Sequence, residues 1–203
     1  IVISLLSIYA CSEDFTTNPR PDVQDLETFF QKEENVESAI IGIYDLMQYN
    51  YSRDWHSAFF VKLLPGDDAN CAGGNSGDQS QLQDIDDYVS VSTSNASIAS
   101  VWDLFYRTIA LSNLVITNIE GSSLANKDSA IAEAKFLRAW CYFELTTMFG
   151  DVPLRLTVPK TTEDFGLMKS SRAAIYAQIE DDLTVAISNL PQTGATENFR
   201  VTV

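Results

Sequence analysis

The stretch IAEAKFLRAWCYFELTTMFGDVPL, residues 131–154, has the apolar pattern of a long helix. One apolar stripe recurs at spacings of three and four residues. It consists of Ile131, Ala134, Leu137, Cys141, Leu145 and Met148. Phe136, Trp140 and Phe143 form a second stripe beside the first. A helix that is apolar over so much of its circumference is packed on more than one side, so we predict a central core helix.

Signals at both ends bound this helix. Asp128 and Ser129 supply oxygens that can cap its N-terminus, and Gly150 followed by Pro153 stops it. Its charged residues include no opposite pair three or four positions apart; they are Glu133, Lys135, Arg138 and Glu144. If Arg138 lies inside, its partner must therefore come from another helix or from a backbone carbonyl.

Similar patterns predict helices on both sides of this stretch. Residues 35–50 read as a first long helix, preceded by a shorter turn over residues 25–34. A second helix is expected from Ile98 to about residue 120. The short loop between it and the central helix predicts an antiparallel helical hairpin. A last helix is expected to begin at Ser170 or Ser171 and to end at Pro191.

The composition is that of a folded chain with a large negative charge. Of its 203 residues, 45% are apolar and 20% are charged, and the formal net charge at pH 7 is −15. A chain without a basic stripe cannot release counterions from a phosphate backbone, so we exclude nucleic acid as a ligand. The charge also disfavours binding to anionic lipid, whereas neutral or cationic ligands fit it.

The N-terminus has the pattern of an exported lipoprotein. Residues 1–10 are apolar apart from Ser4 and Ser7, which is typical of the end of a signal peptide and too short for a membrane span. The run IYAC resembles a lipobox, so we interpret residues 1–11 as a signal remnant with Cys11 as the lipidation site. The polar residues 12–24 read as a tether. A buried strand with a core cysteine is the alternative interpretation.

Three runs in and after the central helix carry a family resemblance. They are AEAKFLRA at 132–139, YFEL at 142–145 and FGDVPL at 149–154. In this order they closely resemble the signature of the SusD/RagB family. Proteins of that family are surface lipoproteins of Bacteroidetes-type bacteria that capture nutrients, mostly glycans, for a TonB-dependent outer-membrane transporter.

The resemblance covers nearly all of the chain. Trp102, Tyr106, Ile109 and Asn113 look like the W-x3-Y-x2-I-x3-N pattern of the family, and DDLTVAISNLP at 181–191 is similar to its D-L-x2-A run. The resemblance implies a mostly α, helical-repeat (tetratricopeptide-like) fold of the SusD type with long irregular loops. It also implies that residues 25–203 are the N-terminal part of a longer SusD-like domain, incomplete at its C-terminus.

The residue types do not favour catalysis or metal binding. His56 is the one histidine, and a lone histidine is more often a packing or surface residue than a catalytic base. The adjacent aspartates at 67–68 and 86–87 are poorly placed to flank one glycosidic bond. With Asp84, the second pair offers calcium ligands, but the spacing matches no EF-hand loop. Cys71 and Cys141 fit neither a zinc spacing nor a disulfide framework, so we expect no enzyme, cofactor or metal site.

Carbohydrate binding fits the sequence better. A polar stretch from Gly66 to about Asn95 lacks strong periodicity, and such long loops are usually functional or disordered. Flat aromatic faces pack against the C–H-rich surfaces of sugars, and amides and carboxylates bond to the hydroxyls. The candidate ligand-binding residues are Trp55, Asp67, Asp68, Asn70, Asn75 and Tyr88. The four-residue spacing of Trp55 and Phe59 nevertheless favours core packing for these two rings.

We therefore expect a protein at the outer membrane, held there only by its lipid anchor, that binds an oligosaccharide and acts with a TonB-dependent SusC-like transporter. A peptide ligand, as in relatives resembling RagB, is the first alternative because an acidic surface tolerates basic peptides. A helical-repeat module that binds another protein is the second. A glycosidase is the third, and would require turnover that is lost when Asp67 or Asp68 is replaced.

Overall fold

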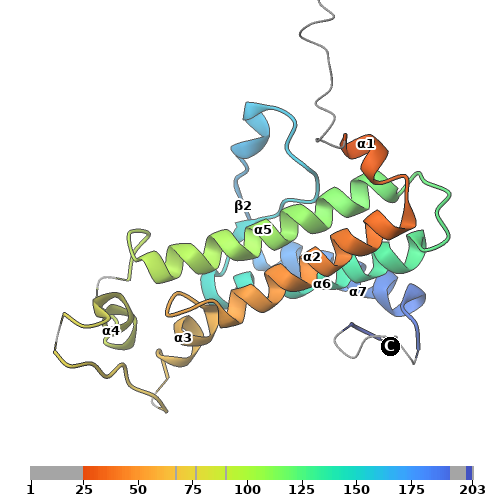
Figure 1. Ribbon diagram of the computed structural model, residues 1–203. Helices are drawn as coiled ribbons and strands as arrows, with labels where there is room; N and C mark the ends of the chain where they lie inside the picture. Colours follow the sequence, from red (N-terminus) through yellow and green to blue (C-terminus); the bar gives the residue numbers. More distant parts are fainter. Residues whose placement is uncertain (1–24, 67, 76, 90, 193–199, 203) are drawn as a thin grey trace, which may run out of the picture.

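Long helices packed side by side form the body of the protein in the computed structural model (Figure 1). They are α2 (Glu33–Ser52), α5 (Ala96–Ile119), α6 (Lys127–Phe149) and α7 (Arg172–Asn189). The structure describes residues 25–66, 68–75, 77–89, 91–192 and 200–202. The expected signal remnant, lipidation site and tether at residues 1–24 lie outside this part. The prediction of a mostly α fold is confirmed, as are the four long helices.

Helix α6 lies at the centre and packs against α2, α5 and α7. Leu137, Cys141 and Leu145 of its main apolar stripe are buried, so the prediction of a core helix is confirmed. The second stripe is less covered than expected, because Trp140 and Phe143 are exposed. This exposure leaves an aromatic strip of α6 on the surface of the described part of the chain.

The ends of the helices agree in part with the expected signals. Gly150 ends α6 as predicted, and the Ser171 hydroxyl caps α7 by accepting from the backbone N–H of Ala174. The predicted start of α6 at Asp128 or Ser129 is wrong, because the helix begins at Lys127. The Ser129 hydroxyl instead donates to the carbonyl oxygen of Asn126, which precedes that first turn.

The antiparallel hairpin of α5 and α6 is confirmed by cross-helix contacts. Asn113, near the end of α5, contacts Arg138 in the middle of α6, and Tyr106, earlier on α5, donates to the carbonyl oxygen of Pro153 beyond α6. Arg138 also reaches Asp182 on α7. The prediction left another helix or a backbone carbonyl open as the source of a partner for a buried Arg138, and the partners lie on other helices.

The apolar interior consists of two main clusters along this bundle. One surrounds Phe105 and Tyr142, where α5 and α6 meet the short helices, and the other joins Ile40 of α2 to Val115 of α5. Phe30 belongs to the second cluster and Phe29 packs against it, with the two ring centroids 5.0 Å apart in an edge-to-face arrangement. Burying a side chain of this size contributes about 1.5–3 kcal/mol to stability.

Shorter elements connect and extend the bundle. They are α1 (Leu26–Phe29), α3 (Ala58–Leu63), α4 (Ser80–Asp86), the strands β1 (Val152–Pro153) and β2 (Lys169–Ser170), and the 3-10 helix η2 (Thr162–Phe165). The strands pair antiparallel at the base of an excursion that carries η2 and projects beside α5 in Figure 1. Among the described residues, we find no helix with the length and hydrophobicity of a membrane span.

Helix α4 corrects one expectation. The polar stretch from Gly66 to Asn95 contains this short helix, which buries Leu82 and Ile85 against the main cluster. Residues on either side of α4 are irregular, so the stretch is a loop that is attached to the core by the two buried side chains of α4.

Candidate functional site

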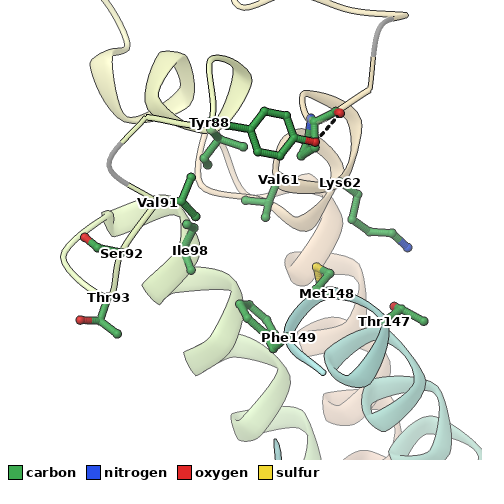
Figure 2. Close-up of a pocket in the computed structure, with 12 residues that line it drawn as sticks. Val61, Lys62, Tyr88, Val91, Ser92, Thr93, Ile98, Thr147, Met148 and Phe149 are labelled. Carbon is green, nitrogen blue, oxygen red and sulfur yellow. Dashed lines mark hydrogen bonds between the residues drawn. The ribbon is translucent and has the colours of Figure 1, made fainter. Parts of the chain in front are cut away.

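A hollow of about 650 Å³ lies at the end of the bundle where α3, α4, α5 and α6 converge (Figure 2). Its wall is mostly apolar and includes Val61, Ile85, Ile98, Met148 and Phe149. These residues come from all four helices, so the hollow depends on the fold rather than on one loop. The volume lies in the range of about 300–1,000 Å³ that is usual for small-molecule sites.

Tyr88 lies across one side of this hollow (Figure 2). Its side chain is 69% exposed, and its hydroxyl donates to the carbonyl oxygen of Pro65 at 2.7 Å. The Tyr88 backbone has a φ of 54°, a left-handed conformation that is costly for a bulky residue. The hydrogen bond joins the segment after α4 to the segment after α3, so the ring is held in place although most of it faces solvent.

Polar groups line part of the same hollow. Ser92, Thr93 and Thr147 contribute hydroxyls, and Lys62 contributes the one charged side chain among the described lining residues. The Lys62 ammonium pairs with the carboxylate of Glu144 on α6 at 2.6 Å. The sequence prediction named none of these residues, because single serines, threonines and lysines carry no motif and converge only when the helices pack.

Trp55 lies at a separate, smaller hollow of about 240 Å³, which Tyr51, Asp54 and Phe60 also line. Its side chain is 54% exposed, and Phe59 is similarly exposed. The preference for core packing of these two rings is therefore wrong. Helix α3 begins only at Ala58, so the helical spacing that favoured burial of Trp55 does not apply to it.

The other candidate residues are dispersed. Asp68, Asn70 and Asn75 are exposed, and none of them lines either hollow. The Asn75 side-chain oxygen accepts from the backbone N–H of Gly77, which shapes a turn. Asp67 lies outside the described residues. Within the described part of the chain, the predicted residues are thus spread over the loop and over two hollows.

The residues whose side-chain types occur in catalytic sites make structural contacts here. A ring nitrogen of His56 lies 2.9 Å from the Ser97 hydroxyl, whereas Asp54 accepts from the His56 backbone N–H instead of orienting its ring. Burial raises the pKa of the Cys71 thiol, and neighbouring carboxylates raise it further, which disfavours a reactive thiolate. In the part of the chain that the structure describes, no three His, Cys, Asp or Glu side chains form a group that could hold a metal ion.

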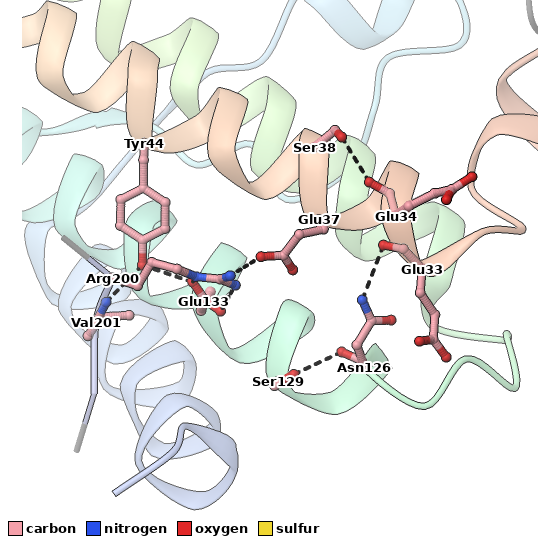
Figure 3. Close-up of polar contacts among 10 residues, drawn as sticks. All are labelled: Glu33, Glu34, Glu37, Ser38, Tyr44, Asn126, Ser129, Glu133, Arg200 and Val201. Carbon is pink, nitrogen blue, oxygen red and sulfur yellow. Dashed lines mark hydrogen bonds and ion pairs between the residues drawn. The ribbon is translucent and has the colours of Figure 1, made fainter. Parts of the chain in front are cut away.

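A second polar cluster joins the C-terminal segment to the bundle (Figure 3). Arg200 pairs with Glu37 on α2 and with Glu133 on α6, and Tyr44 donates to Glu133 at 3.0 Å. Burial raises the pKa of Glu133 to about 7, although the hydrogen bond from Tyr44 lowers it. The Arg200 guanidinium stabilises the charged form of the Glu133 carboxylate. We call this cluster of Arg200, Glu37, Glu133 and Tyr44 the Arg200 clasp, because it connects α2, α6 and the C-terminal segment. It lies near the Lys127 end of α6, away from the hollow of Figure 2.

Comparisons with known proteins place this architecture in a family. A family model described as "Starch-binding associating with outer membrane" matches residues 18–202. A SusD-like protein from Formosa agariphila is 26% identical over 194 residues, which are 91% of this chain and 36% of that protein. A SusD-like protein from Bacteroides ovatus is 26% identical over 200 residues, 95% of this chain and 34% of that protein.

Solved structures agree with this assignment. A laminarin-binding SusD-like protein superimposes with a TM-score of 0.74 at 28% identity, over 85% of this chain and 37% of the other. This chain therefore spans little more than a third of the length of these relatives. The resemblance read from the central helix is confirmed, as is the mostly α, SusD-type fold. Because the family model covers nearly the whole sequence and the fold agrees with it, the chain belongs to the SusD-like family described as starch-binding and associating with the outer membrane.

Proposed function

We propose that this chain is part of a cell-surface lipoprotein that captures an oligosaccharide and passes it to a TonB-dependent SusC-like transporter. The observation that carries the proposal is the hollow beside Tyr88, where an exposed, anchored ring borders an apolar wall. The family description and the laminarin-binding name of one solved relative support a glycan as the ligand.

The chemistry of the hollow suits a sugar. One face of a pyranose ring presents C–H groups, which pack against an aromatic plane, while its hydroxyls require hydrogen-bond partners. Tyr88 offers the plane, and Thr93 offers a hydroxyl. The Ser92 hydroxyl is bonded to Ser94, and the Thr147 hydroxyl donates to the Glu144 backbone carbonyl and keeps its capacity to accept. Capture of this kind is non-covalent, so the ligand is released to the transporter unchanged.

We further propose that polar residues of the 66–95 stretch that do not line the hollow take part in binding. Asp68, Asn70 and Asn75 are exposed and carry carboxylate and amide groups, and Asp67 belongs to the same loop. Trp55 would extend the binding surface as a second aromatic plane on the α3 side. A glycan longer than one hollow could contact both.

The proposed location at the outer membrane depends on Cys11. Acyl chains on this cysteine contribute about 0.8 kcal/mol for each buried methylene, and two or more chains give stable anchoring. Residues 12–24 would serve as the tether. The parent protein should be found in the membrane fraction of cells, and a Cys11→Ala variant should be absent from that fraction. Retention of the variant in the membrane fraction would contradict the lipid anchor.

The central test is calorimetry of the intact, lipid-free protein with laminarin, soluble starch and a set of peptides. Saturable heat with one glycan is expected, and Tyr88→Ala should weaken it at least fivefold. Val89→Ala is the matched control, since Val89 is also exposed and adjacent but does not line the hollow. Tyr88→Phe keeps the ring and removes the bond to Pro65, so it separates stacking from anchoring of the loop.

Other outcomes would assign the chain differently. Heat with basic peptides alone would favour the RagB-like alternative, which the net charge of −15 accommodates. No heat with either set, combined with stable association with the transporter, would favour a protein-interaction module. Binding that is unchanged in both Tyr88 variants would place the glycan elsewhere on the molecule.

A further inference from the structure

The ion pair between Lys62 and Glu144 is unequal in its exposure. The Lys62 side chain is 41% exposed and lines the hollow, whereas the Glu144 side chain is 4% exposed and is not among the lining residues. A carboxylate with so little contact with water depends on its cationic partner. The ammonium is therefore committed to Glu144 at 2.6 Å and is not available as a free positive charge.

We propose that Glu144 determines the ligand class of the hollow by neutralising Lys62, so that the site accepts uncharged saccharides and rejects sulfated or carboxylated ones. This inference rests on the proposed function and adds the class of glycan to it. The residue acts through Lys62 and has no contact with the ligand, so it is a positioning residue.

The other lining groups agree with this assignment. Ser92, Thr93 and Thr147 are uncharged, and apart from Lys62 and Tyr88 the rest of the described wall is apolar. An anionic sugar would leave water without gaining a free cation in the hollow, and burying an unpaired charge is costly. The net charge of −15 adds a repulsion that is felt over about 10 Å at 0.1 M ionic strength.

The position of Glu144 is fixed by its neighbours. It bonds to Lys62 from α3 and also interacts with Tyr51 from α2, whose hydroxyl accepts a hydrogen bond from the Trp140 indole at 2.8 Å. Burial raises the pKa of Tyr51, and the negative charge of Glu144 raises it further. Three helices thus meet at this carboxylate, which leaves it little freedom to release the lysine.

The experiment compares laminarin and soluble starch with the sulfated derivative of each, using the intact protein. The parent protein should bind a neutral glycan at least tenfold more tightly than its sulfated form. Glu144→Gln keeps the shape of the side chain and frees the Lys62 charge. The ratio of the affinity for the neutral glycan to that for its sulfated form should therefore fall by about three- to tenfold, as expected for one charge-assisted hydrogen bond. The double variant Glu144→Gln with Lys62→Gln should restore the parental preference.

A separate variant covers the case in which Glu144→Gln does not fold. Lys62→Gln leaves a bare carboxylate behind the hollow, so sulfated glycans should bind even less well relative to neutral ones. Equal binding of neutral and sulfated glycans by the parent, or a preference that none of the variants alters, would overturn this inference alone. Absence of binding to every glycan would overturn the proposed function with it.

Discussion

The Arg138 guanidinium on α6 and the Asp182 carboxylate on α7 form a two-point ion pair in the interior, with Nε–Oδ2 at 2.8 Å and Nη2–Oδ1 at 2.7 Å. Asn113 on α5 accepts a third bond from Arg138, and Gln178 donates to Asp182. Both charges are buried and their hydrogen-bonding groups are engaged. The pair therefore fixes how α5, α6 and α7 sit relative to one another.

Removing one partner of this pair should be costly. Asp182→Asn leaves the Arg138 charge buried without a counterion, so we expect the free energy of unfolding to fall by about 3–5 kcal/mol. Urea denaturation of the intact protein measures the change. Asp103→Asn is the control, because its pair with Arg107 at 2.9 Å is exposed and should contribute less than about 1 kcal/mol. Similar losses in both variants would contradict the role of the buried pair.

Gly150 allows the chain to turn sharply at the end of α6. Its φ of 78° and ψ of −122° are unfavourable for any residue with a side chain. Gly150→Ala should therefore destabilise the protein by about 1–3 kcal/mol. Gly121→Ala is the matched control, since a methyl group there meets no atom within 4 Å. Thermal unfolding measures the melting temperature of each variant against the parent, and only Gly150→Ala should lower it. An unchanged melting temperature for Gly150→Ala would refute the strain argument.

The central helix was predictable because long periodic segments carry several independent signals. Residue types and spacing predict its apolar stripe and its stop at Gly150. They also predict that a buried Arg138 needs a partner from another helix or from a backbone carbonyl. The identity of that partner was not predictable. Asp182 lies 44 positions away on α7, and only tertiary packing brings the two residues together.

The candidate site was less predictable for related physical reasons. Helix α4 is seven residues long, and its burial rests on Leu82 and Ile85, too few apolar positions to show a period. Tyr88 was selected because it is an aromatic residue in a polar loop, and it does line the large hollow. Lys62 and Thr147 line the same hollow from separate helices, so a single sequence offers no signal that joins them.

The Arg200 clasp should limit the pH dependence of stability that the buried Glu133 causes. Burial holds the pKa of Glu133 at about 7 in the folded parent, above the ordinary value of 4.5, and in Arg200→Gln the loss of the cation raises this pKa further. A raised carboxyl pKa stabilises the fold fully below the unfolded value, and this contribution is lost as the pH rises through the folded value. The loss of stability relative to the parent should thus be smallest at pH 5 and increase as the pH rises through about 7.

Urea titrations of Arg200→Gln and the parent at pH 5, 6, 7 and 8 measure this dependence. Arg107→Gln removes an equally long cation whose partner Asp103 is exposed, so its effect should be small and nearly constant with pH. A pH-independent loss in Arg200→Gln would mean that Arg200 stabilises the segment through packing alone.

Trp55 provides the test of whether the binding surface extends beyond the large hollow. The Trp55 ring is mostly exposed and lies tilted against Phe60, with 5.5 Å between the ring centroids. Replacing Trp55 by alanine should therefore change the free energy of unfolding by less than about 1 kcal/mol. If a glycan stacks on this plane, Trp55→Ala should weaken binding of long oligosaccharides by about five- to thirtyfold, or 1–2 kcal/mol, and leave short ones unaffected. Tyr176→Ala is the control, because Tyr176 is an exposed aromatic residue on α7. Calorimetry with oligosaccharides of increasing length measures the binding of long and short glycans to Trp55→Ala and to the parent. Equal affinities of the two proteins at every length would confine the glycan to the hollow beside Tyr88.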